Sequence, residues 1–331
     1  MSASPPLEQA AASALSSTQR QVQSKRGPWR DAMRRLVHNR MGMVGLGIIL
    51  IFTIAAIFGS TVAPHDPLRQ DLFNTSAGVS GDHWLGTDEL GRDLFSRILT
   101  GARTAMLVAT LVTFIAAGVG TLIGLVSAYI GGIIDTAFMR FADLLLAFPS
   151  FLLAAFINAT LRKPVVDMME GVSDATGIGF ISDKLVIDFA LIFGALALIS
   201  WSGYARLIRG QVLSLREQEF VEAARSMGAS TRAILFRHIL PNSFAPIVVA
   251  VSVNFGNAIL AESALSYLGV GIQPPTPSWG QMINANLDQW RYYPHLVIAP
   301  GAALALLILA FNFFGDGVAD ALNPRRSSRG T

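Results

Sequence analysis

The sequence VEAARSMGASTRAILFRHILP occupies positions 221–241 and separates two apolar segments that are each long enough to cross a membrane. Its Glu-Ala-Ala at 222–224 favours a helix, and Gly228 falls where a left-handed C-terminal cap would end that helix. Ser230 can cap a second helix, and Pro241 is expected to close the unit because its ring cannot continue a helix. The stretch predicts a short polar helix-turn-helix between membrane spans.

The composition indicates a membrane protein. Of the 331 residues, 52% are hydrophobic and 14% are charged, whereas soluble domains carry about 25% charged residues. The chain has no cysteine, which excludes disulfides, thiolate metal sites and cysteine nucleophiles. Its net charge of +3 is carried by basic residues beside apolar segments, a distribution that favours membrane topology over a nucleic-acid partner.

Six apolar segments have the length that a hydrocarbon core of about 30 Å requires. The predicted fold is therefore an all-α membrane protein with six transmembrane helices. The spans are expected at Met43–Val62, Thr104–Ile130, Phe138–Leu161, Leu185–Tyr204, Phe244–Leu260 and His295–Phe314. Within the second, Gly120 and Gly124 form a G-x-x-x-G that predicts close packing on another helix.

The polar segments between the spans complete the predicted organisation. Residues 1–42 are expected to form a cytoplasmic tail, disordered to about residue 24, with a basic helix at the membrane surface near its end; a solvated basic leader is the alternative. Residues 63–102 are expected to be periplasmic, and 162–184 to be a mixed loop. Residues 103–315 would form a five-helix core that contains the polar region at about 214–241, and 316–331 a cytoplasmic C-terminus.

The orientation follows from the Lys and Arg residues. Of the 25 in the chain, 17 fall on the side of the two ends and of the Glu-Ala-Ala region, and seven fall on the opposite side. Loops rich in Lys and Arg remain in the cytoplasm. Both chain ends and the Glu-Ala-Ala region are therefore expected there.

Several kinds of chemistry lack a sequence signal. No lysine stands in a Gly-Lys-Ser/Thr context, so the chain cannot supply a phosphate-binding P-loop. The five histidines form no H-x-x-x-H pair, which makes a metal site unexpected. Asp88, Glu89 and Asp93 lie in a turn-like segment expected to face solvent, which gives no support to hydrolysis by paired carboxylates. No catalytic residue, cofactor site or metal site is predicted.

Four regions together resemble one family. LGTDELGRD at 85–93, with SR at 96–97 and GAR at 101–103, resembles the signature before the second span of dipeptide and oligopeptide ABC permeases of the DppC/OppC type. ESALSYLG at 262–269 with QPPTPSWG at 273–280 is similar to a periplasmic loop of that subfamily. FN, GDG and DALNPR between 311 and 325 resemble its C-terminal end, and 221–241 resembles the "EAA loop" of ABC importers. The resemblance covers about residues 29–326.

The resemblance implies the type I ABC-importer permease (MetI-like) fold in the bacterial inner membrane. The chain would form half of a translocation pathway for di- or oligopeptides and would not itself be an enzyme. Its implied partners are a homologous DppB/OppB-like permease, two ATP-binding subunits of the DppD/DppF type, an extracytoplasmic solute-binding protein and the lipid bilayer, with no nucleic acid. The residues implied in coupling to the ATPase are Glu222, Ala223, Ala224, Gly228, Ala229, Leu240 and Pro241.

Some alternatives remain open at the level of sequence. The same architecture imports nickel chelates, glutathione or opine-like solutes in related systems. An ion channel would need a filter or a charged pore ring, a secondary transporter a carboxylate at mid-membrane, and a membrane-embedded enzyme a nucleophile or metal set; none is evident. The Glu-Ala-Ala stretch taken alone also fits an ordinary connector. Two departures from the family pattern are His238 in place of an apolar residue and the long 162–184 segment.

Overall fold

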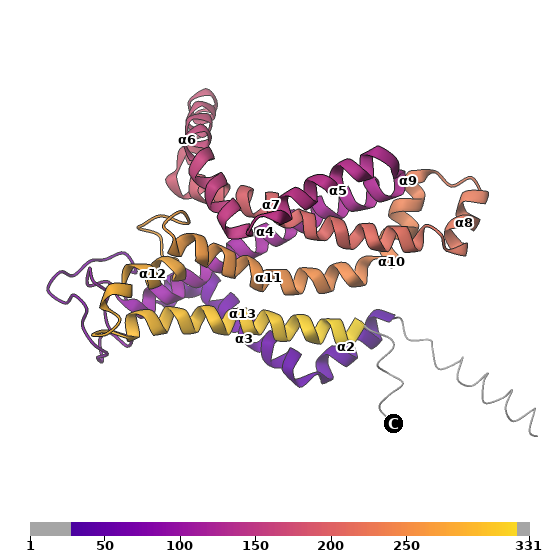
Figure 1. Ribbon diagram of the computed structural model, residues 1–331. Coiled ribbons are helices and arrows are strands. Elements are labelled where there is room, and N and C mark those ends of the chain that lie inside the picture. Colours follow the sequence, from indigo (N-terminus) through magenta and orange to yellow (C-terminus); the bar gives the residue numbers. More distant parts are fainter. Residues whose placement is uncertain (1–27, 323–331) are drawn as a thin grey trace, which may run out of the picture.

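The computed structural model describes residues 28–322, which are mainly helical (Figure 1). Within that range the only β-type pairing is one isolated bridge between Thr87 and Asp93. The predicted all-α class is confirmed.

The longer helices are α2 (Pro28–His38), α3 (Arg40–Val62), α4 (Leu94–Ile130), α5 (Gly132–Ala147), α6 (Ser150–Thr176), α7 (Lys184–Leu215), α8 (Glu219–Ser226), α11 (Phe244–Tyr267), α12 (Trp279–Ala285) and α13 (His295–Leu322). Short pieces are η1 (Gly179–Ser182), α9 (Thr231–Ala233), the π-helix η2 (Ile234–Ile239), α10 (Leu240–Asn242) and η3 (Leu287–Gln289).

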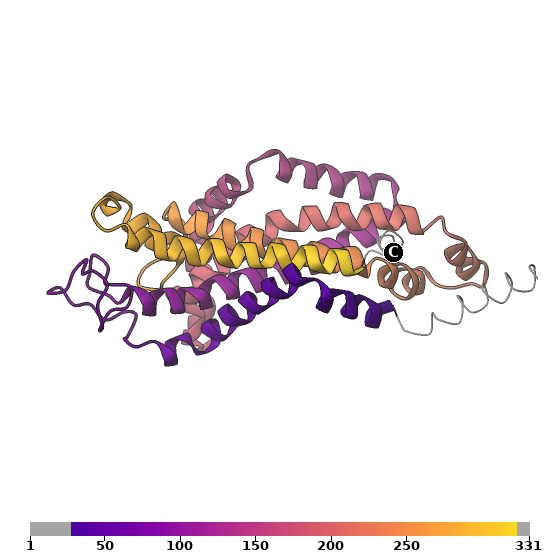
Figure 2. The ribbon, with the colours of Figure 1, turned by 90° about the horizontal axis from the view of Figure 1, so that it is seen from below.

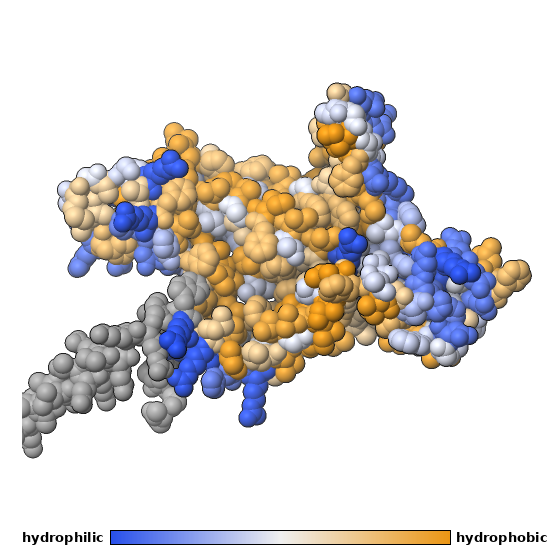
Figure 3. Space-filling view, turned by 180° about the vertical axis from the view of Figure 1, so that it is seen from behind, coloured by the Kyte–Doolittle hydropathy of each residue, from blue (hydrophilic) through white to orange (hydrophobic). Residues whose placement is uncertain are grey.

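Among the described residues, five helices are long and apolar enough to cross a membrane, namely α3, α4, α7, α11 and α13, and the bent pair α5–α6 makes a sixth if it is counted as one span. Large apolar side chains point outward along them, such as Ile51, Ile54 and Phe58 on α3. Figure 3 shows an apolar belt that lies between polar ends. An apolar outer face of this kind suits contact with lipid tails.

The helices extend beyond the apolar segments that the sequence marks. Asp93 caps α4 by accepting a hydrogen bond from the Ser96 amide at 2.8 Å, so this helix begins at Leu94, well before the predicted start at Thr104. Likewise α7 continues to Leu215, and α13 runs on to Leu322 into the expected C-terminal tail. Hydropathy marks only the part of a helix in lipid, whereas helix-forming polar residues prolong it on either side.

The expected third span is wrong as a single straight helix. The chain bends by 95° between α5 and α6. Phe148 lies in extended conformation at the break, because the ring of the following Pro149 disfavours helical geometry in the residue before it. The helix that follows runs to Thr176, where Gly177 caps it at φ 72°, so most of the expected loop at 162–184 is helical.

The packing of α4 against α7 forms the centre of the fold. A Cβ on Gly120 would lie 2.4 Å from the carbonyl oxygen of Trp201, and one on Gly124 would lie 2.5 Å from that of Ala205. Side-chain-free positions at this spacing let the two backbones touch. The prediction that this face of α4 packs on another helix is confirmed.

The two ends of the molecule carry different elements. The 63–93 loop and α12 lie at one end, whereas α2, α8 and the last turn of α13 lie at the other (Figures 1 and 2). The basic segment does form a helix, and Leu36 of α2 lies beside Gly42 and Gly317 where α3 and α13 meet. Its position at a membrane surface stays a prediction, and the expected disorder before residue 25 lies outside the described residues.

Candidate coupling site

Helix α8 holds the Glu-Ala-Ala residues and is amphipathic. Val221 and Ala224 are buried, while Glu222, Ala223 and Arg225 face outward. The two acidic residues of its first turn, Glu219 and Glu222, suit the positive end of the helix dipole. The helix therefore has one apolar side that packs on the rest of the protein and one polar side that is exposed.

Gly228 ends α8 as the sequence predicted. Its φ of +80° is left-handed, a region that side chains disfavour. The Ala229 amide donates to the Ala224 carbonyl at 3.0 Å, and the Gly228 amide donates to that of Arg225 at 3.0 Å. This pair of bonds is the Schellman arrangement, which satisfies carbonyls that a helix end leaves unpaired. Ser230 then caps the next turn by accepting from the Ala233 amide at 3.3 Å, as predicted.

Pro241 does not close the unit, contrary to the prediction. The chain passes from α9 into the π-helix η2 and then into α10, where Pro241 stands at the start of the helix and needs no amide donor. Ser243 donates both its amide and its hydroxyl to the Ile239 carbonyl at 3.0 Å, and α11 begins at the next residue. The polar unit therefore runs almost directly into the membrane helix.

An apolar cluster joins α8 to the membrane helices. It contains Val221 and Ala224 of α8 together with Ile234, Leu235 and Ile239 of η2, Leu125 and Ala128 of α4, Ile208 and Val212 of α7, and Ile247 of α11. Ala229 and Leu240 pack against the cluster from its edge. Of the seven residues implied in coupling, this cluster brings together Ala224, Ala229 and Leu240, while Glu222, Ala223, Gly228 and Pro241 are exposed.

Ion pairs between α5 and α7 lie beside this cluster. The guanidinium of Arg209 binds both carboxylate oxygens of Asp135 at 2.7–2.9 Å, and Arg206 pairs with Asp143. Arg216 donates to the main-chain carbonyl of Ala128 at 3.4 Å. The two-point contact of Arg209 fixes orientation as well as distance, so it holds α5 against the end of α7.

A hollow of about 290 Å³ opens on the side of α4, α7 and α11. Its polar lining includes Thr113, Ser200, Asn254 and Asn257, and its described lining residues carry no charge. Amides and hydroxyls can both donate and accept hydrogen bonds. The hollow suits a solute with polar groups better than it suits a bare ion.

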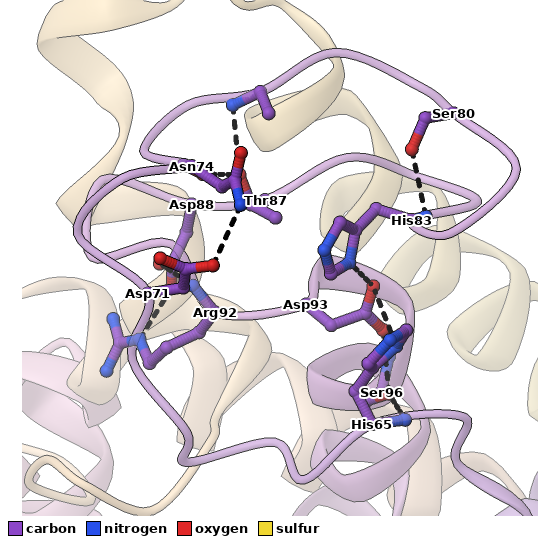
Figure 4. A network of polar contacts seen from close by, with 11 residues as sticks. His65, Asp71, Asn74, Ser80, His83, Thr87, Asp88, Arg92, Asp93 and Ser96 are labelled. Atoms are coloured by element: carbon purple, nitrogen blue, oxygen red, sulfur yellow. Dashed lines mark hydrogen bonds and ion pairs between the residues drawn. The ribbon is translucent and has the colours of Figure 1, made fainter.

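At the opposite end, the segment 85–97 forms a buried polar network (Figure 4). Asp88 binds Arg92 at 2.7 Å and lies 3.4 Å from Arg97, while Thr87 donates its hydroxyl to the Asn74 carbonyl. Asp88 and Asp93 are each only 2% exposed, so the expectation that both face solvent is wrong. Residues 86–88 (Gly-Thr-Asp) and 91–93 (Gly-Arg-Asp) fold back on one another. This fold buries the carboxylates of Asp88 and Asp93 beside their hydrogen-bond and ion-pair partners.

The Asp93 carboxyl is held in its charged form. Burial works against the charge, but hydrogen bonds from Ser96 and His83 outweigh it and keep the pKa of Asp93 below its usual range. His83 Nδ1 lies 2.8 Å from Asp93 Oδ1, and His65 Nδ1 lies 3.8 Å from the same oxygen. His65, His83 and Asp93 are far apart in the sequence, and the fold brings them together.

A further buried carboxyl group and its partners were missed by the sequence reasoning. Glu262 of α11 is 1% exposed and accepts hydrogen bonds from Ser266 at 2.7 Å, Ser278 at 2.8 Å and Ser263 at 3.2 Å. The neighbouring Trp279 donates its indole N–H to the Ile98 carbonyl at 3.1 Å. The serines that flank Glu262 at one and four residues were a usable signal, because those positions lie within reach on a helix.

Comparison with known proteins identifies the family. Residues 120–328 match the model of the binding-protein-dependent transport system inner membrane component, and residues 27–78 match that of the N-terminal TM domain of oligopeptide transport permease C. The chain is 39% identical over 301 residues to the dipeptide transport system permease protein DppC of Alkalihalophilus pseudofirmus, which covers 91% of each chain. It is also 39% identical, over 91% of each chain, to the glutathione transport system permease protein GsiD of Escherichia coli. The chain therefore belongs to the family of binding-protein-dependent transport system inner membrane components, the permeases of ABC importers.

Proposed function

We propose that this permease forms half of an ATP-driven import pathway for small peptides. The relatives are named for dipeptides and for glutathione, which are both small peptides with amide groups. The hollow beside α4, α7 and α11 is lined by apolar side chains together with uncharged polar ones, such as those of Asn254 and Asn257, and these polar groups suit such cargo. Because the hollow is open on one side, a homologous DppB/OppB-like permease would supply the opposite wall.

The exposed side of α8 is the proposed contact with an ATP-binding subunit. The observation that carries this role is that α8 has a rigid cap at Gly228 and an apolar side packed among α4, α7 and α11. Packed interiors transmit displacement because they deform little. A push on the polar side of α8 would move the ends of three membrane helices together, and these helices also line the hollow.

The proposed orientation follows the charge distribution. Cytoplasmic placement of α2, α8 and the end of α13 would leave both chain ends in the cytoplasm and put the 63–93 loop outside. The DppD/DppF-like ATP-binding subunits would then contact α8 from within, and a solute-binding protein would dock at the opposite end, near α12 and the 63–93 loop. The chain would be a multi-pass protein of the bacterial inner membrane.

Nickel chelates and opine-like solutes are weaker candidates, because the two named relatives transport peptides. An ion channel or secondary transporter is disfavoured by the lack of charge among the described residues that line the hollow.

The test is reconstitution. The chain would be expressed with a DppB/OppB-like permease and two ATP-binding subunits from the same organism, purified without crosslinking, and placed in liposomes with a solute-binding protein. We expect a four-chain core whose ATP hydrolysis rises when binding protein carries a dipeptide or glutathione. Uptake or exchange of solute by this chain alone, without ATP, would reject the proposal.

A further inference from the structure

We propose that His65, His83 and Asp93 form a binding site for a divalent transition metal ion, with Zn²⁺ the best fit. The three residues come from the turn after α3, from the middle of the 63–93 loop and from the cap of α4 (Figure 4). Their ligand atoms all lie within 4.8 Å of one another. The site takes no part in the proposed transport cycle and stands independently of it.

The distances suit tetrahedral coordination. With Zn–N and Zn–O bonds of about 2.0–2.2 Å, ligand atoms around a tetrahedral zinc ion lie about 3.3–3.5 Å apart. The oxygen Asp93 Oδ1 lies 2.8 Å from His83 Nδ1 and 3.8 Å from His65 Nδ1, one separation slightly shorter and the other slightly longer. The two imidazole rings lie 4.6 Å apart at an angle of 34°. Small rotations of the two rings, with the proton of His83 carried on Nε2 instead of Nδ1, would bring three donors to a common centre; the ion would then replace the hydrogen bond between His83 and Asp93.

The nitrogen His65 Nδ1 is available to bind a metal ion. It is buried and has no hydrogen-bond partner among the described residues, and a buried polar atom without a partner costs about 1–3 kcal/mol. The main-chain amide of His65 donates to Ser96 Oγ at 3.2 Å, which fixes the residue beside Asp93. A metal ion would use the lone pair that the protein leaves free.

The surroundings hold the ligands in place. Ser96 donates both its amide and its hydroxyl to Asp93 Oδ2, at 2.8 and 2.7 Å, so Oδ1 is left to face the histidines. The amide of His83 donates to Ser80 Oγ at 3.0 Å. Hydrogen bonds of this kind orient metal ligands and contribute to metal affinity.

The nearby cations do not oppose the ion directly. Arg92 and Arg97 are directed to Asp88, at 2.7 and 3.4 Å, and Figure 4 draws the Arg92 guanidinium on the far side of the segment from the histidines. The positive end of the α4 dipole disfavours a cation, but the Asp93 carboxylate lies between that end and the site. One carboxylate and two neutral imidazoles form a common ligand set for Zn²⁺.

A bound ion would hold both ends of the 63–93 loop in place. His65 follows α3 and Asp93 precedes α4, so the ion would tie the two helices together and fix the middle of the loop through His83. A link that closes a long loop stabilises the folded state by restricting the unfolded chain. The His65 and His83 side chains are 37% and 20% exposed, so the cluster lies near the protein surface, where a water molecule could supply the fourth ligand.

The test is metal binding by the full-length chain in detergent, purified with a histidine-free tag and stripped with a chelator. We expect one Zn²⁺ per chain by calorimetry, a visible Co²⁺ spectrum typical of a tetrahedral site, and a higher unfolding temperature with Zn²⁺. His65→Phe and His83→Phe, which keep an aromatic ring, should each weaken binding by at least about tenfold. His38→Phe, which changes an exposed histidine at the other end of the molecule, is the matched control.

Three results would overturn the site: no Zn²⁺ binding by the unaltered chain, binding that both loop variants retain, or equal loss in His38→Phe. Because the readouts are affinity, spectrum and unfolding temperature, they do not depend on transport. A failure of the peptide-import proposal would leave them unchanged.

Discussion

The indole of Trp279 occupies the place where Gly101 has no side chain. A Cβ on Gly101 would lie 2.8 Å from both Cδ1 and Nε1 of the indole, and Trp279 is 1% exposed. The contact joins α12 to the first turns of α4, and Thr104 strengthens the junction by donating its hydroxyl to the Pro277 carbonyl at 3.0 Å. The two signatures around residues 85–103 and 273–280 thus meet in one buried junction.

Gly101→Ala should therefore destabilise the fold. The added methyl group would overlap a buried ring that has little room to move, which costs about 1–3 kcal/mol in well-packed cores. We expect a lower unfolding temperature in detergent. Trp279→Ala removes the ring atoms that the methyl group would overlap, so Gly101→Ala should cost less in that background. An equal cost in both backgrounds would show that the two residues do not interact as described.

The close approach of α4 and α7 gives a second prediction. Gly124→Ala would place a methyl group 2.5 Å from the Ala205 carbonyl oxygen, whereas Gly118→Ala, on another face of α4, meets nothing within 4 Å. We expect Gly124→Ala to lower the free energy of unfolding by about 1–3 kcal/mol and Gly118→Ala to leave it nearly unchanged. Denaturation of the two variants in parallel is the measurement, and similar stabilities would contradict it.

The fold was largely predictable from the sequence because a lipid environment permits few backbone structures. Long apolar segments must be helical, since their backbone polar groups have no water to bind. What hydropathy does not show is where a helix bends inside such a segment. Pro149 holds the signal for the break after Ala147, but a proline in a membrane helix is often tolerated, so the residue alone did not decide between a bend and a straight span.

The capped end of α8 was predictable, while the buried polar sites were not. Gly228 and Ser230 act on neighbours within a few residues, so local spacing is enough to place the Schellman cap and the serine cap. His65, His83 and Asp93 meet only because the 63–93 loop folds back on α4. That return depends on long-range contacts, which one sequence does not show.

Glu262 offers a test of the buried serine network. Glu262→Ala would leave the hydroxyls of Ser266 and Ser278 without their acceptor in a fully buried place. We expect it to lower the free energy of unfolding by at least about 2 kcal/mol, because unpaired buried groups cost about 1–3 kcal/mol each. Ser278→Ala removes one bond and should cost about 1 kcal/mol. If Glu262→Ala unfolded like the unaltered chain, the network would be irrelevant to stability.

The exposed charge of Glu222 tests the proposed contact with the ATP-binding subunit. We expect Glu222→Lys to abolish uptake and peptide-stimulated ATP hydrolysis, because a reversed charge would meet a surface fitted to an acid. Its effect on stability should be small, about 0.3–1 kcal/mol, from the lost interaction with the helix dipole. Glu170→Lys, on exposed α6 toward the other end, is the matched control. Normal uptake by Glu222→Lys would remove Glu222 from the contact.

Gly228 tests whether the cap makes α8 act as a rigid body. A valine there is disfavoured by about 1–2 kcal/mol at φ +80°, whereas asparagine tolerates this geometry. No atom of this chain lies within 4 Å of an added Cβ, so neither side chain clashes within the permease and the two variants differ chiefly in how well they tolerate the backbone geometry. We expect Gly228→Val to lose uptake and Gly228→Asn to retain most of it, with equal amounts of both in the membrane. Uptake assays with immunoblots of the membrane fraction distinguish the cases. Normal uptake by the valine variant would mean that the cap is not needed for coupling, and equal loss in both variants would assign the glycine a role other than backbone geometry.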